Sequence, residues 1–292
     1  MIKLLDQLPK PIAFVFGGGG AYGAVQVGQM RAIAKTDIVP DFCVGTSVGS
    51  LNATVVADTP DIAGDRLAAF WAAITTDVVW GARRSMMMRM ASLRPAVGDT
   101  SALQALLETA TLGRSFEDLT LPLTAVAADA TTGHLVEINQ GDLLSGLLAS
   151  IAIPGIYPPV EREGRKLVDG GVLANVPIGV AARQGAQTIV VFDCGFNLFA
   201  PRTDPTFPHA LLRGVAIMVA GQVRRDLDIH QDRTVLYVPG KWPAAGLPYD
   251  FSKSVQNSTA SFKIAHKWLN ELVIEGPGHY GLPPDVTRNG GA

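Results

Sequence analysis

The sequence carries glycine-rich patterns whose spacing suits acyl-transfer chemistry, and one of them surrounds a serine. Residues 45–49 read Gly-Thr-Ser-Val-Gly, between the apolar run 42–45 and a helix-like stretch. Gly-x-Ser-x-Gly in that context is typical of a nucleophile elbow, a sharp turn that projects the serine hydroxyl above a sheet. Side chains two residues before and after the serine would collide there, which accounts for Gly45 and Gly49. Ser47 is therefore the candidate nucleophile, and the following helix N-terminus would favour developing negative charge.

A run of four glycines, residues 17–20, follows the apolar stretch 12–16 and is completed by Gly23. The Gly-x-Gly-x-x-Gly register is typical of dinucleotide sites, but these also need an acid at the end of the second strand. The nearest acid, Asp41, precedes that strand, so phosphate binding is the less favoured alternative. An acyl-transfer serine needs backbone N–H donors facing the oxyanion, and loops after adjacent parallel strands share one sheet edge. We therefore expect an oxyanion hole formed by Gly18, Gly19 and Gly20.

The proton acceptor for the serine is less clearly marked. None of the five histidines lies in a distinctive setting: His134, His209, His230, His266 and His279. Asp169 is the other candidate, because a short apolar strand ends at it and Gly170 and Gly171 let the backbone turn closely beneath it. A carboxylate becomes an effective base when it is partly buried and within hydrogen-bond reach. From the local sequence, an ordinary turn aspartate, an aspartate base and a histidine base all stay open.

Taken together, these patterns resemble the patatin-like phospholipases, in particular the bacterial branch of that family. The family's three blocks appear in its order: GGGGAYG at 17–23, GTSVG at 45–49 and DGG at 169–171. ASIAIPGIYPPV at 149–160 resembles the segment that leads into the acid, and NVP at 175–177 the one that leaves it.

The resemblance covers about residues 12–195 and implies a Ser–Asp dyad that works without histidine. Ser47 would be the nucleophile and Asp169 the base, with an oxyanion hole from the backbone of residues 18–20 and a lipid acyl ester as substrate. One departure concerns Tyr22, which stands where the family usually carries Arg or Lys. The tyrosine leaves a backbone oxyanion hole intact but removes a charge that could attract anionic phospholipids.

Apolar runs alternate with amphipathic stretches along most of the chain. Strands are expected at 12–16, 42–45, 123–128, 135–138, 188–193 and 234–238. Helices are expected over 59–74, with Thr59 as N-cap and Pro60 at the first position, and over 209–227. This alternation predicts an α/β fold with a mostly parallel central sheet flanked by helices, and the resemblance implies the patatin-like three-layer architecture. We expect a single domain over 1–275 and a tail without regular structure over 276–292.

The composition of the 292-residue chain narrows the partners and the setting. A net charge of −2 and a pI near 6.2 give no case for nucleic-acid binding. No apolar run approaches the ~18 residues of a membrane span, and the N-terminus lacks the pattern of a secretion signal. Cys43 and Cys194 are expected as buried free thiols, and no residue cluster implies a metal or another cofactor. We therefore expect a cytoplasmic protein.

The segment 78–98 breaks the alternation with four methionines and four arginines. It could be a basic loop with some core packing. It could also be a flap whose methionines adapt to flexible acyl chains and whose arginines make a peripheral membrane contact.

The function expected from these residues is that of a serine acyl hydrolase: a phospholipase, lipase or esterase that cleaves fatty-acyl esters. The alternatives are an α/β-hydrolase-type esterase with a histidine triad, an inactive lipid-binding relative, and an acyltransferase that uses the same serine. Histidine substitution and labelling by a fluorophosphonate probe would separate the first two from the expected dyad.

Overall fold

The computed structural model describes residues 2–75, 104–105, 107–108, 114–195, 207–241 and 250–283. The described residues form one nine-stranded sheet with the strand order β5-β6-β3-β2-β1-β7-β8-β9, and β4 pairs with β3. The strands are β1 Ile12–Phe16, β2 Phe42–Thr46, β3 Leu123–Asp129, β4 Leu135–Ile138, β5 Val160–Arg162, β6 Arg165–Asp169, β7 Thr188–Phe192, β8 Thr234–Tyr237 and β9 Gly278–Tyr280. The pairs from β3 through β2, β1, β7 and β8 to β9 are parallel, whereas β4, β5 and β6 pair antiparallel.

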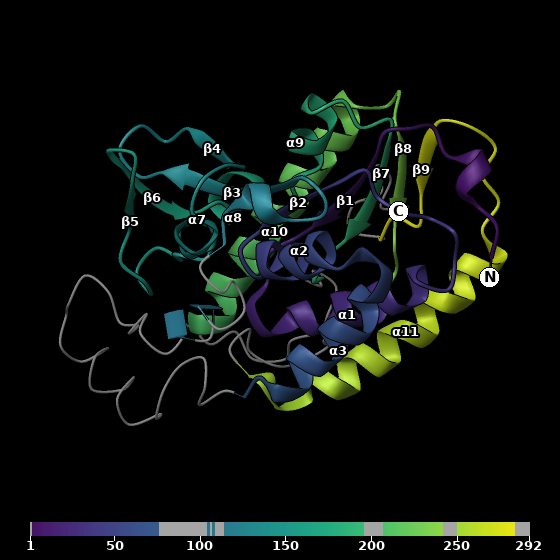
Figure 1. Cartoon of the computed structure of the whole chain (residues 1–292), viewed down its shortest axis with the longest axis horizontal. Helices are drawn as coiled ribbons and strands as arrows, with labels where there is room; N and C mark the ends of the chain where they lie inside the picture. Colours follow the sequence, from purple (N-terminus) through teal and green to yellow (C-terminus); the bar gives the residue numbers. More distant parts are fainter. Residues whose placement is uncertain are drawn as a thin grey trace.

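Helices cover both faces of this sheet, which confirms the expected mostly parallel α/β fold. The α-helices are α1 Ala24–Ile33, α2 Val48–Asp58, α3 Ala63–Ala73, α7 Leu143–Ser150, α8 Gly171–Ala174, α9 Ile178–Arg183, α10 Phe207–Ile229 and α11 Ser254–Glu271. One buried cluster joins the sheet to α1, α2, α3, α7 and α11, and a second joins it to α8, α9 and α10. Figure 1 shows α11 lying alongside α1 and α3, on the opposite side from α9.

The central strand β1 explains why two core clusters form. All five of its side chains are buried and apolar, as a parallel strand covered on both faces requires. Successive side chains point to opposite faces, so Ile12, Phe14 and Phe16 join the first cluster while Ala13 and Val15 join the second.

The pairing around β3 brings two strand ends together. Ala125 and Val126 pair with β2 on one side and β4 on the other, while Ala127 and Ala128 pair with β4 and β6. A strand residue has only two lateral neighbours, so β2 and β6 must share one edge of β3. Since β2 ends at the level of Val126 and β6 ends at the level of Ala127, the two strands meet end to end.

Two expectations about local structure were wrong. Thr59 precedes a 3-10 turn, Pro60–Ile62, rather than an α-helix, and its hydroxyl donates to the Val55 carbonyl oxygen instead of capping the turn. Gly278–Tyr280 forms β9, although no regular structure was expected after residue 275. This strand is too short to show an alternating pattern, and its pairing with β8 supplies the hydrogen bonds that its own sequence does not predict.

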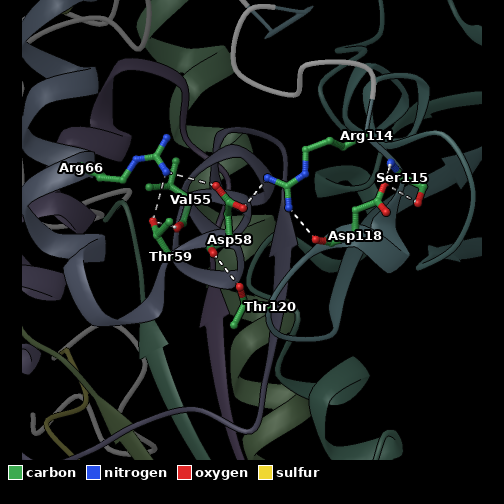
Figure 2. Close-up of polar contacts among 8 residues, drawn as sticks. All are labelled: Val55, Asp58, Thr59, Arg66, Arg114, Ser115, Asp118 and Thr120. Carbon is green, nitrogen blue, oxygen red and sulfur yellow. Dashed lines mark hydrogen bonds and ion pairs between the residues drawn. The ribbon is translucent and has the colours of Figure 1, made fainter.

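The far end of α2 is held by charged side chains (Figure 2). Asp58, the last residue of α2, accepts hydrogen bonds from Arg66 of α3 and from Arg114. The Thr120 hydroxyl donates to the Asp58 carbonyl oxygen at 2.8 Å. Two guanidinium groups offset a carboxylate at the negative end of a helix dipole, so these contacts anchor the helix that begins at the elbow.

Candidate active site

Ser47 occupies a strained turn between β2 and α2. Its φ of 55° and ψ of −132° lie outside the conformations that non-glycine residues usually adopt, and its side chain is mostly buried. The neighbouring glycines are required sterically. A Cβ on Gly45 would lie 2.5 Å from the Gly49 carbonyl oxygen, and a Cβ on Gly49 would lie 2.3 Å from the Phe16 carbonyl oxygen. This is the crowding expected of a nucleophile elbow.

Asp169 ends β6, and the Ser47 side chain is near enough to its carboxyl to lower the carboxyl pKa. The Gly171 N–H donates to the Asp169 carboxylate at 2.7 Å, and the Asp169 N–H donates to the Ala152 carbonyl oxygen at 2.9 Å. Burial raises the pKa of the Asp169 carboxyl from 3.8 to about 6, although the Ser47 side chain and the Gly171 N–H act to lower it. The carboxyl therefore changes its charge close to neutral pH.

The glycine loop after β1 passes directly against the elbow. A Cβ on Gly18 would lie 3.1 Å from the Cβ of Ser47. The Gly18 N–H donates to the Asn175 carbonyl oxygen at 2.9 Å, so it does not face an oxyanion as expected. Nothing in the described part of the chain accepts a hydrogen bond from the N–H of Gly19 or Gly20. Of the three N–H groups expected to face an oxyanion, those of Gly19 and Gly20 are therefore the ones without an acceptor among the described residues.

Asn175 holds the glycine loop through two hydrogen bonds to Gly18. Besides accepting the Gly18 N–H, it donates from its side-chain Nδ2 to the Gly18 carbonyl oxygen at 3.2 Å. The Asn175 N–H in turn donates to the Gln222 side chain of α10 at 3.0 Å. In the sequence, the NVP stretch stood out only by resemblance. The contacts show that Asn175 links the glycine loop to α10.

A buried polar chain that sequence reasoning missed supports the loop from the other side. Gln26 of α1 donates to the carbonyl oxygens of Gly17 and Phe192 at 2.7 and 2.9 Å. Its side-chain oxygen accepts from Asn52 of α2 at 2.7 Å, and Asn52 accepts from the Trp71 indole at 2.8 Å. The sequence did offer one signal for this chain. Gln26 and Asn52 are amide side chains on otherwise apolar helix faces, and buried polar groups need hydrogen-bond partners.

The motif glycines are packed tightly around the site. A Cβ on Gly23 would lie 2.8 Å from the Trp71 ring, and one on Gly170 would lie 2.4 Å from the Val126 carbonyl oxygen. A Cβ on Gly171 would lie 3.0 Å from the Asp169 carboxylate. Side chains at these positions would displace the elements that carry Ser47 and Asp169.

No histidine is among the hydrogen-bond partners found for Ser47 and Asp169 in the described residues. His134 is exposed in the turn between β3 and β4, and the side chain of His209 lies outside the description.

Cys43 and Cys194 are free and buried, as predicted. The described residues include no group of three His, Cys, Asp or Glu side chains that could hold a metal ion. The segment 78–98 lies outside the described residues.

Tyr22 lies in the 3-10 turn Gly20–Gly23 directly after the glycines, and it is half-buried. Its N–H donates to the Gly19 carbonyl oxygen at 3.1 Å. The tyrosine therefore takes part in the backbone turn that closes the glycine loop.

Comparison with known proteins matches residues 14–182 to the model of the patatin-like phospholipase family. The chain is 32% identical over 187 residues to patatin-like phospholipase domain-containing protein 7 of Rattus norvegicus, covering 63% of this chain and 14% of that protein. It is 28% identical over 214 residues to lysophospholipase NTE1 of Mycosarcoma maydis, covering 68% of this chain and 10% of that protein. The chain thus spans about a seventh or less of these two relatives.

Two solved structures resemble the fold at low sequence identity. VipD from Legionella pneumophila aligns with a TM-score of 0.43 and 13% identity, covering 90% of this chain and 67% of that one. Human GIVD cytosolic phospholipase A2 aligns with a TM-score of 0.45 and 12% identity, covering 91% of this chain and 59% of that one.

Among the described helices of this chain, none is both long and apolar enough to cross a membrane.

Proposed function

Because the chain belongs to the patatin-like phospholipase family, we propose that it is a lipid acyl hydrolase with a Ser47–Asp169 dyad. Family membership supports hydrolysis of a lipid acyl ester in general. The finer assignment rests on one observation: a serine in a strained elbow lies near enough to a buried aspartate to lower the pKa of its carboxyl.

The chemistry follows from the protonation of Asp169. With a pKa of about 6, the carboxyl is mostly ionised at neutral pH and accepts the Ser47 proton as the serine oxygen bonds to the ester carbonyl carbon. The N–H groups of Gly19 and Gly20 and the N-terminus of α2 stabilise the resulting oxyanion. Asp169 then returns the proton to the departing alcohol.

A second half-reaction releases the fatty acid. Water donates a proton to Asp169 and attacks the carbonyl carbon of the acyl-Ser47 ester. The tetrahedral intermediate collapses, the bond to the Ser47 oxygen breaks, and that oxygen recovers the proton from Asp169. No cofactor enters either step.

The substrate is proposed as a lipid with an ester-linked acyl chain. Tyr22 supplies no positive charge in the glycine loop, which argues against a strong preference for anionic head groups. Segment 78–98 is proposed, from its sequence alone, as a flap over the acyl chain and as a peripheral membrane contact.

The deciding experiment is an ester panel on the purified chain with Ser47→Ala as the control. Phospholipids, lysophospholipids, acylglycerols and p-nitrophenyl esters would be compared, together with labelling by a fluorophosphonate probe. We expect hydrolysis and labelling by the wild type only. A wild type that is neither labelled nor active would instead support an inactive lipid-binding protein, and release of acyl chains only to an added alcohol would support an acyltransferase.

A further inference from the structure

We propose that Ser150, the last residue of α7, is a positioning residue that sets the orientation of the nucleophile elbow. This inference rests on the proposed function, since it concerns the same dyad. Ser150 is fully buried, and it lies at the start of the segment 149–160, which the resemblance marks without giving this serine a role.

The Ser150 hydroxyl lies in the break between the ends of β2 and β6. It donates to the Val126 carbonyl oxygen of β3 at 2.7 Å and accepts the Ser47 N–H at 3.0 Å. Val126 is the last β3 residue that pairs with β2. The hydroxyl thus replaces the strand-to-strand contact that ends there, and it links the elbow to β3.

The turn at Ser47 makes this contact necessary. β2 ends at Thr46 and Ser47 precedes the first turn of α2, so neither element supplies a partner for the Ser47 N–H. A buried N–H that loses its partner is destabilising, because it has given up its hydrogen bond to water without a replacement. Since Ser150 supplies that partner on the Ser47 backbone itself, its loss would move the nucleophile rather than a distant part of the fold.

The same segment also holds the other half of the dyad. Two residues after Ser150, the Ala152 carbonyl oxygen accepts the Asp169 N–H at 2.9 Å. Residues 150–152 therefore contact the backbones of both Ser47 and Asp169. A shift of this segment would change the Ser47–Asp169 separation, on which proton transfer depends.

The test compares Ser150→Ala with Ser261→Ala. Ser261 is also a fully buried serine whose hydroxyl accepts a backbone N–H, from Lys241 at 2.9 Å, but it lies on α11. Both variants lose a buried acceptor, so both should unfold more easily. We expect only Ser150→Ala to lower kcat, by about tenfold to a hundredfold as for a misplaced catalytic group, with KM for a p-nitrophenyl ester little changed.

Two further measurements separate positioning from general destabilisation. Fluorophosphonate labelling should slow in Ser150→Ala in proportion to kcat, and Ser150→Thr, which keeps the hydroxyl, should recover activity that Ser150→Val does not. If Ser150→Ala fails to fold, Ser150→Cys, with its weaker donor and acceptor, should give a reduced kcat at unchanged KM.

Equal kcat values for Ser150→Ala and Ser261→Ala, or wild-type kcat in Ser150→Cys, would overturn the positioning role. Such a result would leave the nucleophile intact as long as Ser47→Ala is inactive. Full activity in Ser47→Ala would instead reject the proposed function itself, so the two failures are distinguishable.

Discussion

The turn after β2 and the turn after β6 carry the two halves of the proposed dyad, but they prepare their side chains differently. Ser47 sits at a φ of 55°, a conformation that costs free energy for a residue with a Cβ. Asp169 ends an ordinary strand, and the turn after it begins at Gly170 with an unstrained φ of −67°. The proposed nucleophile thus lies on a strained backbone, whereas burial sets the pKa of the proposed base.

Within one site, Ser47 is therefore set by backbone geometry and Asp169 by electrostatics. Strain at Ser47 directs the hydroxyl and would act at every pH. Burial at Asp169 raises a pKa and acts only where that carboxyl titrates. Substitutions at the two positions should therefore differ in their dependence on pH and in their effects on stability.

The largest effect is expected for Ser47→Ala. Losing a nucleophile costs several orders of magnitude in kcat, while the fold should survive because the turn depends on Gly45 and Gly49. Ester hydrolysis and circular dichroism of the purified variant would check both statements. Activity within about tenfold of the wild type, against the orders of magnitude that a lost nucleophile costs, would reject Ser47 as the nucleophile.

Asp169→Asn should lose nearly as much activity as Ser47→Ala, because an amide cannot accept the serine proton. The matched comparison is the set of single histidine variants: His134→Ala, His209→Ala, His230→Ala, His266→Ala and His279→Ala. Each of these should keep most of its kcat/KM on a p-nitrophenyl ester. A histidine variant that is folded but inactive would favour a triad over the dyad.

The pH profile of the wild type should report the burial of Asp169. Because the base must be ionised and burial raises its pKa to about 6, kcat/KM should fall about tenfold for each pH unit below that value. Above it, the rate should level off until another group titrates. A profile that is flat down to about pH 4.5, close to the ordinary carboxyl range, would contradict a buried aspartate base.

Sequence patterns predicted the local parts of this site because those parts depend on neighbouring residues. Gly45 and Gly49 predicted the elbow. The apolar runs predicted six strands almost to their ends: β1, β2, β3, β4, β7 and β8. The end-to-end meeting of β2 and β6 could not be predicted, since it depends on pairing across more than a hundred residues.

The same reason explains the supporting residues that were missed. Ser150, Asn175 and Gln26 act through hydrogen bonds to residues far away in the sequence. Ser150 and Asn175 lie in segments marked only by resemblance, which gave the individual residues no role, and nothing near Gln26 distinguishes it from other polar residues. The expectation that Gly18 donates to an oxyanion failed likewise, because its N–H is occupied by a carbonyl from Asn175.

A smaller effect concerns stability at the base. A carboxyl whose pKa is raised on folding supports the fold below its unfolded pKa of 3.8, and that support is lost as the pH rises through about 6. A shift of this size corresponds to about 3 kcal/mol. Asp169→Asn should therefore gain stability relative to the wild type between pH 4 and pH 8.

Urea unfolding of both proteins at the two pH values would measure this gain, because groups common to both cancel in the difference. A difference that stays constant with pH would show that Asp169 is not held in a desolvated setting.

The smallest effect concerns the strain at the elbow. Ser47→Ala and Ser47→Gly both lose the hydroxyl, but only glycine adopts a φ of 55° without cost. The glycine variant should be more stable than the alanine variant by about 1 kcal/mol. Glu163, in the β5–β6 turn at a φ of 51°, is the matched control. Glu163→Gly should exceed Glu163→Ala in stability by a similar amount while both hydrolyse esters normally. Equal stabilities at position 47 alone would mean that the elbow stores no strain.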